Sequence, residues 1–238
     1  MLFVWYKVSF DEKWSHGSAV CETVYFFVEF VCVFPWKCVS LNNQNREKIM
    51  DGILRKLPIG IQTFEKLREG DYLYVDKTAL VWRIASTETP YFLSRPRRFG
   101  KSLLLSTFEA YFEGKKELFE GLAIADMEKE WKTYPVFHLD LNAEKYDSPQ
   151  ALVEILSRQL TQWELKYGKG EDEETLSGRF AGVIRRACEQ SGRGVVVLVD
   201  EYDKPLLQAL GDDALLDDYR KTLKAFYGVL KSSDRYLR

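Results

Sequence analysis

The apolar positions of the chain follow two patterns, one typical of strands and one typical of helices. Residues 195–199 are successive aliphatic residues, as in a strand that is buried on both faces of a parallel sheet. Residues 135–141 suit a second core strand. Apolar residues recur at helical spacing in several further segments: 64–68, 80–85, 101–112, 149–163, 175–190 and 216–230. This alternation predicts an α/β fold with a parallel sheet and right-handed crossovers.

A third apolar segment, residues 91–93, leads into a basic loop and then into a helix that opens on Gly100, Lys101 and Ser102. The first amide N–H groups of such a helix can face a polyphosphate, the lysine can neutralise its β and γ oxygens, and the serine hydroxyl can be a ligand of Mg²⁺. The stretch therefore predicts a strand followed by a nucleotide-binding P-loop, or Walker A motif. The Gly-Lys-Ser tripeptide alone also fits an ordinary helix start with a solvated lysine.

The loop before this helix departs from the general pattern G-x-x-x-x-G-K-[ST]. That pattern asks for glycine at position 95, where this chain has Arg95. The guanidinium groups of Arg95, Arg97 and Arg98 could supply charge to a phosphate or contact a partner, and they could equally form an exposed basic turn. Both interpretations stay open on the sequence.

Asp200 and Glu201 follow the buried strand at the point where it would leave the sheet. In a Walker B arrangement, Asp200 would hold Mg²⁺ through its water shell and Glu201 would polarise the water that attacks the γ-phosphate. A buried strand with a solvated acidic turn would look the same in isolation. The combination with the Gly-Lys-Ser helix upstream favours one nucleotide site made from both segments.

Two residues of the predicted strand 135–141 have side chains that could take part in a site, but neither belongs to a specific motif. Asp140 is a weaker site candidate at the end of that strand. His138 is predicted to be a packed strand histidine, because no serine or cysteine motif accompanies it.

Composition excludes some classes of function. The chain has 238 residues with 34 basic and 36 acidic side chains, so its net charge of −2 gives no global field for nucleic acid or an anionic membrane. The cysteines lack CxxC spacing and a nearby histidine, so reduced thiols without disulfide or zinc are expected at Cys21, Cys32, Cys38 and Cys188. A P-loop enzyme is expected in a compartment that contains ATP, so a cytoplasmic location is expected.

Several segments together resemble the bacterial AAA-ATPase-like family over about residues 57–238. They are 94–102 (Ser-Arg-Pro-Arg-Arg-Phe-Gly-Lys-Ser) and 199–205 (Val-Asp-Glu-Tyr-Asp-Lys-Pro), with 57–60 and 74–78 upstream. In that family Arg-Pro-Arg-Arg-Phe-Gly-Lys-[ST] is the usual P-loop, so Arg95 is typical of it. The resemblance implies a P-loop NTPase-like parallel sheet of the additional-strand type, with ATP and Mg²⁺ as cofactors.

The candidate site follows from the motifs and this resemblance. Glu201 and Lys101 are the candidate catalytic residues, and Ser102 and Asp200 are the candidate metal ligands. The candidate nucleotide-binding residues form one continuous run: Arg97, Arg98, Phe99, Gly100, Lys101, Ser102 and Leu103.

The chain is expected to have an atypical N-terminal extension, residues 1–49, and one domain, residues 50–238. The apolar run 24–34 in the extension carries Glu29 and is too short to span a bilayer. The extension is either an added hairpin or interfacial segment, or translated sequence upstream of a start at Met50, which is the favoured interpretation.

The resemblance implies that a further strand and a PD-(D/E)xK nuclease-like domain would follow Arg238. The chain is therefore expected to be truncated within its ATPase core, with weak or absent hydrolysis on its own. An interaction with nucleic acid would come through the missing domain. Assembly into a homo-oligomer is left open, and no membrane partner is expected.

Three functions remain in order of preference. The first is an ATP-binding domain with Mg²⁺-dependent hydrolysis in the intact protein. The second is a nucleotide-regulated module that controls a partner or an attached nuclease with little turnover. A phosphotransferase ranks last, since the sequence shows no acceptor pocket. Residues 58–61 and 74–78 could contact the nucleotide base, or their aromatic residues could be core with a solvated Asp76-Lys77 turn.

Overall fold

The computed structural model describes residues 55–94, 99–142 and 145–238. The chain divides into two compact units, and every described residue except Arg55 belongs to the unit that contains Lys56–Arg238. The expectations for residues 1–49 and for Arg95, Arg97 and Arg98 lie outside the described residues.

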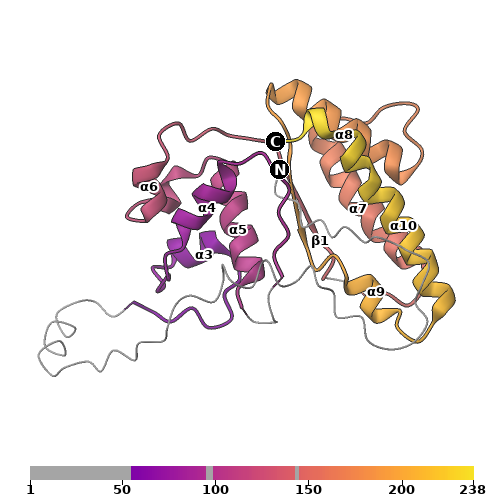
Figure 1. Ribbon diagram of the computed structural model, residues 1–238, viewed down its shortest axis with the longest axis horizontal. Coiled ribbons are helices and arrows are strands. Elements are labelled where there is room, and N and C mark those ends of the chain that lie inside the picture. The colour runs from indigo at the N-terminus through magenta and orange to yellow at the C-terminus, as the bar shows by residue number, and fades with distance from the viewer. Residues whose placement is uncertain (1–54, 95–98, 143–144) are drawn as a thin grey trace, which may run out of the picture. The chain divides into compact units, whose positions relative to one another are not determined.

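Two parallel strands form the sheet of the described residues (Figure 1). Strand β1 is Val136–Asp140 and strand β2 is Val196–Asp200, and their register places Asp140 beside Asp200. Both strands were predicted from the apolar pattern and both are confirmed. All residues of β2 are buried, as a strand covered on both faces requires.

The strand predicted for residues 91–93 is wrong. Residues 91–94 have no regular secondary structure. A strand exists through its ladder of backbone hydrogen bonds to a neighbour, and along its length β2 pairs only with β1 among the described residues. The apolar composition of 91–93 reflects packing instead, since Phe92 makes an edge-to-face contact with Tyr202 at 5.7 Å between ring centroids.

The last residues of the chain contact the start of β2. The Val195 amide donates to the Tyr236 carbonyl at 2.8 Å, and the Arg238 amide donates to the Val195 carbonyl at 3.0 Å, which makes a parallel bridge between Val195 and Leu237. The Val196 amide bonds instead to the Pro135 carbonyl, next to β1. Because successive backbone groups of a strand point to opposite edges, the bridge lies on the edge of β2 away from β1.

One helical layer packs on the sheet face that carries Val196 and Leu198. Its core is largely aromatic, and Phe64, Phe108 and Phe119 are fully buried in it. The helices predicted near 64–68, 80–85 and 101–112 all belong to this layer and are confirmed. Its elements are α3 (Phe64–Glu69), α4 (Thr78–Ala85), α5 (Lys101–Phe112), the 3₁₀ helix η2 (Lys116–Phe119) and α6 (Ala123–Met127).

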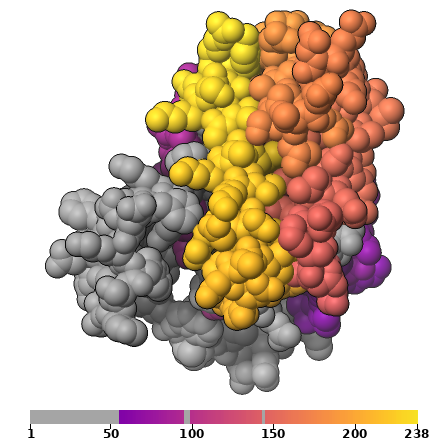
Figure 2. All heavy atoms as spheres, turned by 90° about the vertical axis from the view of Figure 1, so that its right-hand side faces the viewer, coloured from indigo at the N-terminus to yellow at the C-terminus, as the bar shows by residue number. Residues whose placement is uncertain are grey.

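A second helical layer packs on the opposite face, which carries Val197 and Val199. Figure 2 looks onto its outer side, where α10 (yellow) lies beside α7 and α8. Its elements are α7 (Pro149–Tyr167), α8 (Leu176–Ser191), α9 (Lys204–Gln208), α10 (Asp213–Ser232) and the 3₁₀ helix η3 (Asp234–Tyr236). The alternation of side chains along each strand thus sends odd-numbered residues to this layer and even-numbered residues to the α5 layer.

Local signals set the ends of the longer helices. Thr175 caps α8 by accepting a hydrogen bond from the Gly178 amide, and Asp212 caps α10 by accepting one from the Leu215 amide. Pro149 occupies the first turn of α7, as predicted. Ser148 is at the N-cap position as expected, but its side chain makes no capping bond.

A buried ion pair joins α7 to α8. The Arg179 guanidinium donates to both carboxylate oxygens of Glu164, from Nε at 2.8 Å and from Nη2 at 2.7 Å. Its remaining donors reach the Ser157 hydroxyl at 2.6 Å and the Thr161 hydroxyl at 2.8 Å. The two charged side chains are only 10% and 6% exposed, so the pair is satisfied within the layer instead of by solvent.

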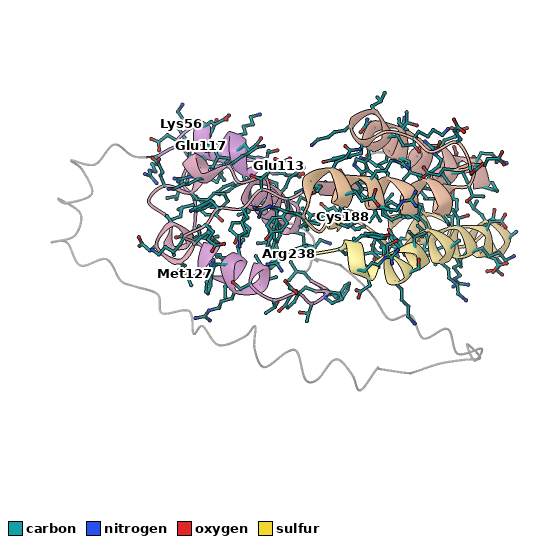
Figure 3. The ribbon with its side chains drawn as sticks, turned by 90° about the horizontal axis from the view of Figure 1, so that it is seen from above. Lys56, Glu113, Glu117, Met127, Cys188 and Arg238 are labelled. Atoms are coloured by element: carbon teal, nitrogen blue, oxygen red, sulfur yellow. The ribbon has the colours of Figure 1, made fainter. Side chains whose placement is uncertain are left out.

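Figure 3 shows both layers with their side chains. Cys188 lies on α8, packed against the core of its layer, and burial raises the pKa of its thiol. Arg238 lies between the layers, where its guanidinium contacts the Ala85 carbonyl and the Glu88 carboxylate. Within the described residues, no helix has the length and apolar character needed to cross a membrane.

Candidate functional site

The start of α5 and the end of β2 lie together in space. Lys101, the first residue of α5, places its Nζ 3.5 Å from Oε1 of Glu201, the residue after β2. Each of these side chains is 27% exposed, so the pair is accessible from solvent without being fully hydrated. The two motifs that the sequence predicted to converge are therefore adjacent.

The backbone at the start of α5 is arranged as an anion-binding helix terminus. Gly100 is the N-cap residue with φ 73° and ψ 31°, a left-handed conformation that favours glycine. The Leu104 amide donates to the Gly100 carbonyl at 3.0 Å and closes the first turn. Among the described residues, no group accepts from the amides of Lys101, Ser102 and Leu103. The first N–H groups of a helix have no partner within the helix and bind phosphates readily.

Asp200 belongs to the sheet face that meets α5. Val196 and Leu198 pack into the α5 layer, and Asp200 follows them at the same alternation, so its carboxylate is on that face. Asp200 is 6% exposed, and its Oδ1 accepts from the Glu201 amide at 3.0 Å. Asp140 is its register partner on β1 and is exposed, with Oδ1 accepting from the Asn142 amide at 2.7 Å.

Glu201 has an unusual backbone conformation. Its φ is 52°, in the left-handed region where a residue with a Cβ is strained by about 1–2 kcal/mol. The turn that follows is closed by a hydrogen bond from the Lys204 amide to the Glu201 carbonyl at 3.0 Å. Strained residues of this kind persist only where their surroundings hold them, and they cluster at functional sites.

Sequence reasoning missed a contact that links the ends of the two strands. Lys204 Nζ donates to the backbone carbonyl of Asn142 and, at 2.8 Å, to its side-chain oxygen Oδ1. Asn142 lies two residues beyond β1, and Lys204 is the first residue of α9, four residues beyond β2. Their separation of 62 residues leaves no local signal that could have indicated the pair.

His138 is a packed strand residue, as predicted. Its Nδ1 is 2.9 Å from Oε2 of Glu109, two turns along α5 from the helix start. Burial alone would lower the pKa of His138, but the Glu109 carboxylate, with Asp140 and Asp200 adding to it, raises the pKa overall. The contact joins β1 to α5 on the sheet face that also carries Asp200. No local pattern indicated Glu109 as the partner of His138.

The remaining candidates of the nucleotide-binding run differ in position. Phe99 is 64% exposed, just before the helix. Leu103 is partly buried against the core of the α5 layer, so only its backbone faces the helix start. Arg97 and Arg98 lie outside the described residues.

The contacts of Asp76 and Thr78 favour the structural interpretation of residues 74–78. Asp76 Oδ1 accepts from the amide and the hydroxyl of Thr78, and its Oδ2 accepts from the Ala123 amide at the start of α6 at 2.7 Å. Thr78 is buried, and its hydroxyl accepts from the Ile124 amide at 3.1 Å. Burial alone would raise the pKa of Asp76, but these hydrogen bonds lower it overall. The pair ties α4 to α6.

The donor set at the site fits a hydrated Mg²⁺ bound together with a phosphate. The described residues contain no group of three or more His, Cys, Asp or Glu side chains that could enclose a metal ion. The candidate oxygen donors are the Ser102 hydroxyl in the first turn of α5 and the Asp200 carboxylate at the end of β2, and α5 contacts β2. Mg²⁺ usually keeps several waters and binds through one or two protein oxygens plus substrate phosphates, which matches this set.

Comparison with known proteins identifies the family of the chain. Residues 58–238 match the model of the AAA-ATPase-like family, described as predicted AAA-ATPase. A protein of Azotobacter chroococcum mcd 1, described as an uncharacterized protein in the vnfD 5'region, is 42% identical over 185 residues. That match covers 77% of this chain and 36% of the relative, so the chain spans about a third of its length. No solved structure matches the chain. The match over residues 58–238 shows that the chain belongs to the AAA-ATPase-like family of predicted AAA-ATPases.

Proposed function

We propose that this domain binds Mg²⁺-ATP at the start of α5 and, in the intact protein, hydrolyses it. The observation that carries the proposal is the approach of Lys101 Nζ to Glu201 Oε1 at 3.5 Å, beside a helix start whose first amides have no acceptor within the described part of the chain. A cation, the first amides of α5 and carboxylates meet at one end of a buried strand. This combination suits a polyphosphate with its metal ion.

Each residue has a distinct role in this proposal. The amides from Lys101 to Leu103 bind the phosphate oxygens, and Lys101 neutralises their charge. Ser102 and Asp200 hold Mg²⁺, with Asp200 acting through water. When bound, the metal neutralises charge that develops on the phosphates. Lys101 binds the terminal phosphate in this proposal, and Glu201 lies beside Lys101. Glu201 would therefore be near enough to that phosphate to orient a water molecule.

Replacing Glu201 by glutamine tests the proposed reaction. The substitution keeps the size of the side chain and removes its basicity, so Mg²⁺-dependent phosphate release by the full-length protein should fall about 100- to 1,000-fold. ATP affinity measured by calorimetry should remain within about threefold, since the groups that bind phosphate are unchanged. Glu117→Gln, at an exposed residue of η2, is the matched control and should behave as wild type.

Two results would redirect the proposal. Wild-type turnover by Glu201→Gln would remove Glu201 from the reaction. ATP binding by the wild-type full-length protein without any Mg²⁺-dependent phosphate release would instead assign the site to a nucleotide-regulated module, which acts on a partner or on an attached nuclease-like domain.

A further inference from the structure

The turn that carries Glu201 is held from both sides. On one side, the Tyr202 ring packs edge-to-face on Phe92, in the segment that leads toward α5. On the other side, the Lys204 ammonium donates to two oxygens of Asn142, beyond the end of β1. The Lys204 amide also closes the turn by donating to the Glu201 carbonyl at 3.0 Å. Lys204 thus binds the turn through its backbone and the β1 end through its side chain.

This double attachment matters because Glu201 has a φ of 52°. A residue with a Cβ leaves the left-handed region when its surroundings allow it, so the conformation indicates that the turn is constrained. The hydrogen bonds from Lys204 to Asn142 carry a charge, which makes them stronger than bonds between neutral groups. Lys204 and Asn142 lie at the carboxyl end of the sheet. Asp140 and Asp200, which are register partners, lie at the same end.

We infer that Lys204 and Asn142 are positioning residues, which together fix the Glu201 carboxylate relative to Lys101. The inference rests on the proposed function and adds residues to the same site. Neither residue is assigned a contact with ATP. Their contribution is to hold the Glu201 turn against the end of β1, so that the carboxylate remains near the Lys101 ammonium and hence near the terminal phosphate.

Replacing Lys204 by methionine in the full-length protein should therefore separate turnover from binding. The kcat for ATP hydrolysis is expected to fall about 10- to 100-fold, since a displacement of about 1 Å at a catalytic group has effects of this size. The dissociation constant for Mg²⁺-ATP should change less than about twofold, because the start of α5 is not touched. Lys221→Met, which removes an exposed pair with Asp217, is the matched control and should leave both quantities unchanged.

Variants of Asn142 provide the conservative comparison. Asn142→Asp keeps an oxygen acceptor for Lys204 and should retain kcat, whereas Asn142→Ala removes one of the two acceptors and should lower it. In a Lys204→Met background, Asn142→Ala should cause no further loss, because coupled residues are not additive. If Lys204→Met does not fold, as judged by its thermal unfolding, the two Asn142 variants test the inference by themselves.

The outcomes distinguish this inference from the proposed function. Slow turnover by Glu201→Gln with wild-type kcat for Lys204→Met and Asn142→Ala would overturn the positioning role alone. A loss of ATP affinity as large as the loss of kcat would also overturn it, because Lys204 would then bind the nucleotide itself. Wild-type turnover by Glu201→Gln would overturn both.

Discussion

Replacing Lys101 by alanine should raise the dissociation constant of Mg²⁺-ATP about 100-fold. Charged hydrogen bonds contribute about 1.5–3 kcal/mol each, and every 1.4 kcal/mol is a tenfold change in affinity. Lys101 supplies the positive side chain at the helix start, where it forms an ion pair with Glu201. Removing it leaves the backbone amides in place but removes the side-chain cation that faces the phosphates. Calorimetric titration of the full-length protein measures the change.

The fold should survive this substitution, because the Lys101 side chain is partly exposed and packs in no core. Lys116→Ala, at an exposed residue of η2, is the matched control and should bind ATP as the wild type does. Unchanged affinity for Lys101→Ala, with unfolding like that of the wild type, would show that the nucleotide binds elsewhere.

The largest effect on stability is expected at the buried pair of Glu164 and Arg179. Replacing Arg179 by methionine should lower the free energy of unfolding by about 3–5 kcal/mol, because a buried carboxylate loses its counterion. The Ser157 and Thr161 hydroxyls would lose their donor at the same time. Urea unfolding of the full-length protein, followed by circular dichroism, gives the difference between the variants.

The double variant Glu164→Leu/Arg179→Met separates the charge effect from packing. Apolar side chains of similar volume often replace a buried ion pair without loss, so this variant should recover most of the lost stability. Lys221→Met, which removes an exposed pair on α10, should change the free energy by less than about 1 kcal/mol. Equal losses in the single and double variants would mean that shape, and not the unpaired charge, sets the cost.

Local patterns account for much of the fold that was predicted. The sequence predicts β2 from its uninterrupted aliphatic run, and it predicts α5, α7, α8 and α10 from their helical spacing. These patterns depend only on residues that are close together in the sequence. Residues 91–93 show the limit of this reasoning. Their apolar composition satisfies the pattern of a strand, but a strand also needs a paired neighbour, and composition carries no information about pairing.

The candidate site was predictable in outline for a geometric reason. In a parallel sheet, the carboxyl end of a buried strand lies close to the start of a helix that opens on Gly-Lys-Ser. Lys101 and Glu201 could therefore be placed together. The left-handed backbone of Glu201 could not be predicted, since glutamate rarely adopts it. The partners of Lys204 and His138 could not be predicted either, because they depend on how distant segments pack.

The long-range contacts also decided between interpretations that the sequence left open. Asp76 could have faced a nucleotide base or formed a solvated turn, and its exposed position with hydrogen bonds inside the protein favours the structural interpretation. Its carboxylate binds the Ala123 amide at the start of α6, 47 residues away, and so connects two helices of the α5 layer. Only the three-dimensional arrangement shows this function of the residue.

We expect one metal-bound triphosphate to contact both the start of α5 and the end of β2. The most direct measurement is a crystal structure of the full-length protein with Mn²⁺ and a non-hydrolysable ATP analogue, in which anomalous scattering locates the metal. We expect the metal at the Ser102 hydroxyl and the phosphates, with a water molecule between the metal and Asp200 and with Lys101 at the terminal phosphate. A metal and triphosphate bound away from Lys101 and Asp200 would contradict it.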